Sequence, residues 1–247
     1  METEYYGGIP VDVVTYEMIL KKLPNWFKSN EQKRLTSINP QIISFAANHP
    51  DILAYIEQSD CRLPDGIGIV MLSKWMGGEL KERVTGIELM TLFLRYASTH
   101  KKKVFLFGSK PEVVKQAARN IKREFKLDTC KFLDGYSELK DKEIVQQINA
   151  SKADFLFVGL GFPLQEKWLA ANSHKINAKI ILDVGGSFDV LSGKVKRAPL
   201  FVRKHHLEWV YRSFQHPKRL IRIVQLPVFI FLVLTQKKKR LKNGTIT

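Results

Sequence analysis

The chain has 247 residues, of which 45% are hydrophobic and 26% charged, and it contains two cysteines. This composition excludes a globally disordered chain, and the length suits one large domain or a domain with an appendage. Two cysteines, Cys61 and Cys130, cannot form a disulfide framework, and their spacing is not that of metal ligands. This favours a protein of the reducing cytoplasm. The acidic N-terminus lacks the cationic start and apolar core of a signal peptide, so we expect the core to stay in the cytoplasm.

The positive charge is concentrated at the C-terminal end. Residues 194–247 hold fourteen Lys and Arg against one acid, Glu208, and so contribute +13 of the formal net charge of +16. The preceding 193 residues carry 26 basic and 23 acidic side chains and are nearly neutral. We therefore divide the chain into a core of residues 1–193 and a basic appendage of residues 194–247.

Apolar runs alternate with segments of helical periodicity along the core. Residues 103–107 and 154–158 are almost continuously apolar, as is typical of strands buried on both faces of a parallel sheet. Strands that alternate with helices of 10 to 15 residues indicate βαβ crossovers. The sequence predicts an α/β fold with a Rossmann-like, mainly parallel sheet flanked by helices. The expected strands are 34–38, 61–63, 103–107, 131–133, 154–158 and 179–182, and the expected helices are 41–58, 67–75, 86–98, 112–124, 142–151 and 164–173.

In such a sheet the ligand binds beyond the carboxyl ends of the strands. Glycine loops there, each followed by a helix N-terminus, can hold a diphosphate through free backbone N–H groups, and Gly108, Gly161 and Gly185 are placed in this way. The alternative is that these glycines only turn the chain. No complete G-x-G-x-x-G occurs, which argues against the alternative that the protein is a nicotinamide oxidoreductase.

Five polar side chains near the expected strand ends have both a structural and a functional interpretation. Asp65 lies in a Pro-Asp-Gly turn sequence, yet a carboxylate there could take a proton from an attacking hydroxyl. Arg83 is either a solvated charge or a clamp for phosphate. Asn39 suits a helix cap and a ligand contact equally. Gln165 directs an amide toward the expected crevice, and Glu166 is either a dipole-stabilising acid or a second ligand contact.

No Asp-x-Asp occurs in the chain, although many nucleotide-sugar transferases use that pair to hold a divalent cation on the diphosphate. An enzyme of that class without the motif needs cationic side chains instead, and we expect no metal or other cofactor. A helix is predicted from Pro217, and Arg219 and Arg222 share one face of it. Arg212 joins them if the chain bends at Pro217. The alternative is a solvated basic face.

Residues 226–234 form the most apolar stretch and are followed by Lys237-Lys-Lys-Arg240. As a helix the stretch reaches about 13 Å, against roughly 30 Å for the hydrocarbon core of a bilayer, so it cannot span one. An apolar segment beside basic residues suits the surface of an anionic membrane. An interface in a homo-oligomer and burial in the core stay as alternatives.

The order of the motifs resembles the WecG/TagA/CpsF family of bacterial glycosyltransferases. The resemblance covers residues 7 to 225. The matching motifs are Asn39-Pro40, Leu63-Pro-Asp-Gly66, Glu82-Arg83-Val-Thr-Gly86, Phe105-Leu-Phe-Gly108, Val158-Gly-Leu-Gly161, Pro163-Leu-Gln-Glu166, Val184-Gly-Gly-Ser-Phe-Asp189, Gly193, Arg197-Ala-Pro199 and Leu207-Glu-Trp-Val-Tyr-Arg212, with Pro217 and Arg219 after them.

The resemblance implies an inverting, metal-independent enzyme on the inner face of the bacterial plasma membrane. It would move a hexose, often N-acetylmannosamine or its uronate, from a UDP-sugar onto an undecaprenyl-diphosphate-linked sugar, for teichoic acid, capsule or a related surface polysaccharide. By resemblance Asp65 is the candidate general base, Asn39 and Gln165 line the pocket, and Arg83 supports the active site. The arginines Arg212, Arg219 and Arg222 would neutralise the UDP leaving group.

Two motifs depart from the family pattern. The common Thr-x-Asn is here Ser37-Ile38-Asn39, which keeps a hydroxyl beside the pocket, so Ser37 joins the expected substrate-binding residues. The common Pro-Lys-Gln-Glu is here Pro163-Leu164-Gln165-Glu166, which removes a cation. The identity of the sugar therefore stays open. The alternative from a different functional class is a basic nucleic-acid-binding α/β module, which fits the pI of about 9.8. It gives the apolar residues 226–234 no role, so we expect no nucleic acid partner.

Overall fold

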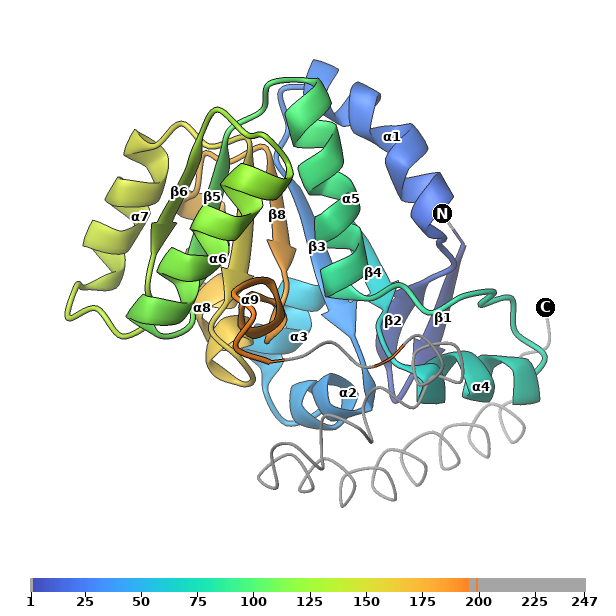
Figure 1. Ribbon diagram of the computed structural model, residues 1–247. Coiled ribbons are helices and arrows are strands. Elements are labelled where there is room, and N and C mark those ends of the chain that lie inside the picture. The colour runs from blue at the N-terminus through green and yellow to red at the C-terminus, as the bar shows by residue number, and fades with distance from the viewer. Residues whose placement is uncertain (1, 196–198, 200–247) are drawn as a thin grey trace.

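The computed structural model describes residues 2–195 and 199, where helices cover both faces of a parallel sheet (Figure 1). Within these residues the sheet has six strands in the order β4-β3-β8-β7-β5-β6, and every neighbouring pair is parallel. An antiparallel hairpin, β1-β2, lies outside the sheet. The predicted α/β class with a Rossmann-like sheet is confirmed. The strands are β1 Thr3–Tyr6, β2 Ile9–Asp12, β3 Lys33–Ile38, β4 Cys61–Pro64, β5 Val104–Gly108, β6 Cys130–Leu133, β7 Phe155–Gly159 and β8 Ile180–Asp183.

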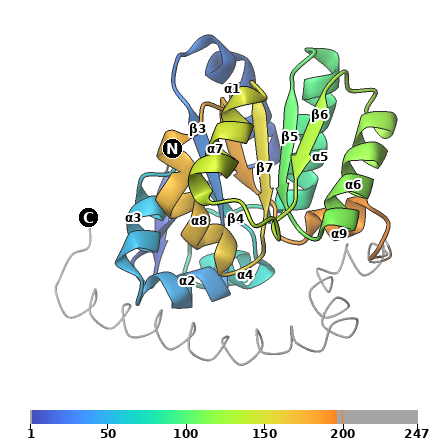
Figure 2. The same cartoon turned by 90° about the vertical axis from the view of Figure 1, so that its left-hand side faces the viewer.

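The helices divide between the two faces of the sheet (Figure 2). One apolar cluster joins α2, α3, α7 and α8 to the sheet, and a second joins α1, α5, α6 and α9 to its opposite face. The helices are α1 Tyr16–Lys28, α2 Pro40–Ala46, α3 Pro50–Glu57, α4 Ile67–Trp75, α5 Gly86–Thr99, α6 Pro111–Glu124, α7 Asp141–Ala150, α8 Leu164–Asn172 and α9 Ser187–Leu191, with a 3-10 turn at Ser173–Lys175.

Strand β7 shows why the central strands are apolar throughout. All five of its residues are buried, because helices cover both sides of the sheet. Phe155 and Phe157 pack in the cluster with α5 and α6, whereas Leu156 and Val158 pack on the opposite face with α8. Alternation of side chains along a strand therefore gives each helix layer its own apolar surface.

The carboxyl ends of the strands meet at one edge of the sheet, which faces downward in Figure 1. In the register of the sheet, Ile38 pairs with Pro64, Val158 with Asp183, and Gly108 with Gly159. The loops that follow these positions are therefore brought to one side of the molecule. This edge is the one where the sequence places the ligand.

The prediction of one helix over residues 41–58 was wrong. The chain forms two helices there, α2 and α3, and His49 between them has φ −134° and ψ 88°. Pro50 explains the break, because its ring disfavours a helical conformation in the preceding residue. The hairpin, α1 and α9 were not predicted. The strands of the hairpin and α9 are short, and α1 contains Pro24, which usually indicates the end of a helix.

The helical appendage predicted for residues 194–247 lies almost entirely outside the described residues. Its arginines Arg212, Arg219 and Arg222 and the apolar residues 226–234 belong to that part, so their predicted roles stay predictions. Within residues 2–195 and 199, no helix is both long and apolar enough to cross a membrane.

Candidate functional site

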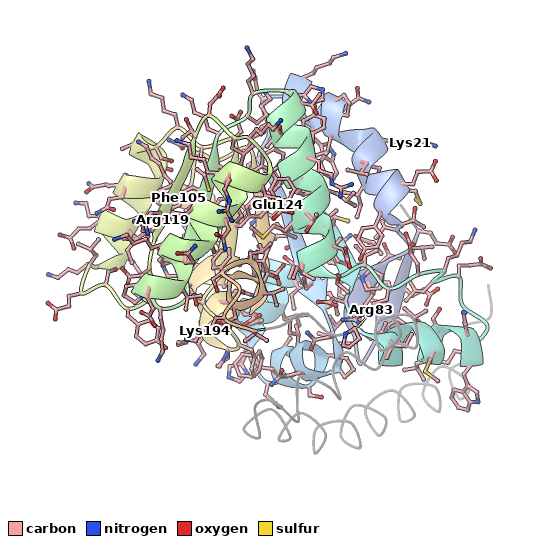
Figure 3. All side chains as sticks on the ribbon, in the orientation of Figure 1. Lys21, Arg83, Phe105, Arg119, Glu124 and Lys194 are labelled. Carbon is pink, nitrogen blue, oxygen red and sulfur yellow. The ribbon has the colours of Figure 1, made fainter. Side chains whose placement is uncertain are left out.

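Asp65 and Arg83 lie together at the carboxyl edge. Asp65 directly follows β4, and Arg83 Nη2 is 3.4 Å from its Oδ1. The two side chains are 23% and 19% exposed, so both reach the surface while much of each is covered. Figure 3 shows Arg83 at the lower end of the molecule, near α4. The two residues predicted to be catalytic are therefore brought into contact.

Helix α1 anchors the segment that carries Arg83. The backbone N–H of Tyr16 donates to Glu82 Oε1 over 2.7 Å, and the Tyr16 phenol accepts from the backbone N–H of Thr85 over 2.7 Å. Burial raises the pKa of Tyr16, which keeps the phenol protonated. On the other side, Val84 N donates to Pro64 O at the end of β4. Arg83 is thus held between two fixed points beside Asp65.

Asn39 caps α2, as its position before Pro40 predicts. Its Oδ1 accepts from the backbone N–H of Ile42 over 3.0 Å. The loop after β4 packs closely against it, because a Cβ added to Gly66 would stand 3.2 Å from Pro40 Cδ and 3.5 Å from Asn39 Cβ. The cap orients the Asn39 side chain next to the Asp65 loop. A role for Asn39 in substrate binding stays a prediction.

The glycine loops after β5 and β7 touch each other. Gly108 has φ +123°, and an added Cβ would lie 2.5 Å from the carbonyl carbon and oxygen of Gly159. Gly161 has φ +80° and Gly185 has φ +48°, but among residues 2–195 and 199 no heavy atom beyond the chain neighbours lies within 4 Å of an added Cβ at either. Gly108 is therefore required by packing, whereas Gly161 and Gly185 leave the loop backbone open.

We expect Gly108→Ala to lower the free energy of unfolding by about 2 to 4 kcal/mol, because it combines a strained φ with a backbone clash. Gly161→Ala is the matched control, since it has the strained φ without the clash and should cost about 1 kcal/mol. Chemical denaturation of both variants measures the difference. Equal losses would show that the contact between the two loops is not tight.

Gln165 and Glu166 are both 3% exposed and belong to a buried polar network. Gln165 Nε2 donates to Glu166 Oε1 and to Asp183 Oδ2, each over 3.2 Å. Gln165 Oε1 accepts from the backbone N–H of Gly185 over 3.0 Å. The Gln165 amide, expected to point into the crevice, is instead bonded on both sides within the protein. Its contact with a substrate stays a prediction.

Asp183 is the residue that the sequence reasoning missed. It ends β8, is 3% exposed, and accepts from the backbone N–H of Ser37 over 2.8 Å as well as from Gln165. Two residues predicted to bind substrate are therefore joined through it. The sequence did contain a signal for it, since an acidic residue at the end of an otherwise apolar strand is expected to be buried. A buried carboxyl needs hydrogen-bond donors from neighbouring segments.

Comparisons with known proteins identify the family of the chain. The glycosyl transferase WecG/TagA/CpsF family matches residues 5–243. Two Staphylococcus aureus proteins, from strains MW2 and COL, are 32% identical to the chain over 234 residues. Both are named N-acetylglucosaminyldiphosphoundecaprenol N-acetyl-beta-D-mannosaminyltransferase, and the similarity covers 94% of this chain and 92% of each relative. The chain therefore belongs to the WecG/TagA/CpsF family of glycosyltransferases.

Proposed function

We propose that the protein transfers a hexose, N-acetylmannosamine or a related sugar, from a UDP-sugar to an undecaprenyl-diphosphate-linked sugar in the synthesis of a cell-surface polymer. The observation that carries this proposal is the Asp65–Arg83 pair at the carboxyl edge of a sheet in a chain of this glycosyltransferase family. The relatives' names supply the sugar and the acceptor class. The choice of donor nucleotide is part of the proposal.

The proposed reaction is a single displacement with inversion at the anomeric carbon. The acceptor hydroxyl oxygen attacks that carbon, and Asp65 takes the hydroxyl proton. The bond from the carbon to the diphosphate oxygen breaks, and its electron pair leaves with UDP. Arg83 holds the Asp65 carboxylate in place through the 3.4 Å contact and adds a positive charge near the diphosphate.

The remaining predicted residues complete the proposed site. The loops of the carboxyl edge would bind the two substrates, and three arginines of the appendage would neutralise the leaving group without a metal ion. The loop residues are Ser37, Asn39, Gly108, Gly161, Gln165, Glu166 and Gly185, and the arginines are Arg212, Arg219 and Arg222.

A transfer assay on the full chain tests the function. Undecaprenyl-diphosphate-linked N-acetylglucosamine is offered with a panel of UDP-sugars, and the lipid product is identified by mass spectrometry. We expect UDP release and a product extended by one sugar with UDP-N-acetylmannosamine or a close relative, unchanged by a chelator. A folded protein that forms no product with any donor, or a product that retains the donor's anomeric configuration, would refute the proposal.

We also propose that the basic appendage binds the inner surface of the plasma membrane. Each Lys or Arg near an anionic surface contributes about 1 kcal/mol, so replacing Lys238 and Lys239 by alanine should weaken binding to phosphatidylglycerol vesicles roughly thirtyfold. Vesicle sedimentation measures this, with Lys21→Ala as a control on the exposed face of α1. Equal binding by the wild type, the double variant and Lys21→Ala would count against membrane binding by the appendage. Light scattering without vesicles measures whether the protein forms a homo-oligomer instead.

A further inference from the structure

The buried carboxyl of Asp183 joins two other segments of the site. Asp183 lies on β8, between β3 and β7, and its Oδ1 accepts from Ser37 N over 2.8 Å. Its Oδ2 accepts from Gln165 Nε2 over 3.2 Å. Asp183 therefore connects the end of β3 to the first turn of α8. Among the described residues, the Asp183 carboxyl is the acceptor for Ser37 N, whereas Gln165 Nε2 has Glu166 Oε1 as a second acceptor.

Three hydrogen bonds orient the Gln165 amide, and the Asp183 carboxyl accepts one of them. A backbone N–H can only donate, so Gly185 N must meet the oxygen of the amide, and the distance of 3.0 Å to Oε1 agrees. Nε2 is then left with two hydrogens, which it donates to Asp183 and Glu166. If the Asp183 acceptor is lost, one Nε2 hydrogen has no partner, and the amide is held less firmly against the Gly185 loop.

The surroundings of Asp183 disfavour its charged form. The titratable groups that act on it are Glu166 of α8, Asp65 after β4 and the phenol of Tyr55 on α3. Burial, then the charge of Glu166 and that of Asp65, raise the pKa of Asp183 to about 8, although bonds from Ser37 oppose the shift. At neutral pH the carboxyl therefore accepts hydrogen bonds without placing another negative charge near Asp65.

We propose that Asp183 is a positioning residue for the transfer reaction, whose buried carboxyl holds the Ser37 segment and the Gln165 amide in place beside Asp65. This inference rests on the proposed function. The neutral carboxyl is the working form, because a negative charge at this point would repel both the Asp65 carboxylate and the diphosphate of the donor. Ionisation of Asp183 at alkaline pH should then slow the reaction.

Asparagine cannot replace this carboxyl, even though it is uncharged and has the same shape. The amide introduced by Asp183→Asn would have one oxygen and one NH2 group, whereas Ser37 N and Gln165 Nε2 both donate. One of the two donors would face the NH2 group whichever way the amide turns. A protonated carboxyl lessens this conflict, because it carries one hydrogen where an NH2 group carries two, and its hydroxyl oxygen keeps lone pairs that can accept.

The experiment measures kcat and KM from pH 6 to pH 9.5 for the wild type, Asp183→Asn and a control, Asp141→Asn. Asp141 also accepts two hydrogen bonds, from Trp168 and Asn172, but within the part of the chain that the structure describes no hydrogen bond joins it to the loops of the site. We expect Asp183→Asn to lower kcat at least tenfold at pH 7 with less than a threefold change in donor KM. The wild-type kcat should fall as pH rises through about 8, and this alkaline decline should be absent in Asp183→Asn.

A purely structural role would lower the folded fraction without removing the alkaline decline. Asp183→Asn with a kcat within twofold of wild type, or with the alkaline decline intact, would overturn the proposal. The control should keep both the wild-type kcat and the wild-type pH profile. If Asp141→Asn loses activity and the alkaline decline to the same extent, Asp183 has no special position and the proposal is also overturned.

A measurement without substrate separates this inference from the proposed function. Between the ordinary pKa of an aspartate, 3.8, and about 8, the unfolded chain releases the Asp183 proton while the folded protein keeps it. The wild-type free energy of unfolding should therefore fall with rising pH across this window relative to that of Asp183→Asn, and the difference should level off above pH 8. If the free energies of unfolding of the two proteins change in parallel with pH, the assigned charge state is wrong. A wild type that is inactive with every donor would instead refute the proposed function, and it would leave these unfolding curves unaffected.

Discussion

Asp65→Asn is expected to lower kcat by about 10² to 10⁴-fold, because an amide cannot take the proton of the attacking hydroxyl. The variant should remain folded, since the Asp65 side chain is 23% exposed and asparagine has nearly the same size and shape. Arg83 would keep its place, because Tyr16 and Pro64 anchor the flanking residues. Steady-state transfer assays and thermal unfolding of the same preparation check both statements.

Asp51→Asn is the control for this change, since it makes the same substitution at an exposed position of α3. It should leave kcat unchanged. Titration calorimetry with UDP should give both variants a dissociation constant within threefold of wild type. Wild-type turnover by Asp65→Asn would show that another group accepts the proton.

Replacing Asp12 by alanine should lower the free energy of unfolding by about 3 to 5 kcal/mol, which is the cost of breaking a buried ion pair from one side. Asp12 is fully buried at the end of β2, and its two oxygens accept from Arg62 Nε and Nη2 over 3.1 and 2.8 Å. They also accept from Arg62 N and Thr3 Oγ1. The change leaves the mostly buried Arg62 guanidinium without its carboxylate, and the hairpin loses its main polar link to β4.

The denaturant midpoint, with the slope of the transition unchanged, measures this loss. Glu17→Ala serves as the comparison, because Glu17 and Lys21 form an exposed pair one helical turn apart on α1. Water screens such an exposed pair, so its loss should shift the midpoint very little. If the two variants have equal midpoints, the Asp12–Arg62 pair gives no net stabilisation.

Local patterns predicted the part of the fold that depends on local physics. The apolar runs that become β5 and β7 are buried on both faces, and that burial is visible in the sequence as uninterrupted hydrophobicity. The N-cap role of Asn39 follows from the adjacent Pro40 and was also predicted correctly. The place of Asp65 at a strand end needed only the turn sequence after it.

Contacts between distant segments could not be read in this way. Ser37 and Asp183 are 146 residues apart, and they meet because β8 pairs with β3, a choice that no local pattern encodes. The Asp12–Arg62 pair similarly depends on where the hairpin packs. The same limit explains why the internal bonding of Gln165 was not predicted, since two of its three partners, Asp183 and Gly185, lie on a strand and a loop that follow it in the chain.

The position of β8 has a consequence for how the protein is made. This strand is the last of the sheet in the chain, yet it lies between β3 and β7. Until residues 180–183 leave the ribosome, the sheet consists of two separate halves, each with an unpaired apolar edge. The loops of Asn39 and Asp65 belong to one half, and those of Gly108 and Gly161 belong to the other. Closure of the sheet by β8 therefore also brings the loops of the candidate site together, so we expect a nascent chain that ends before β8 to be inactive and prone to aggregate.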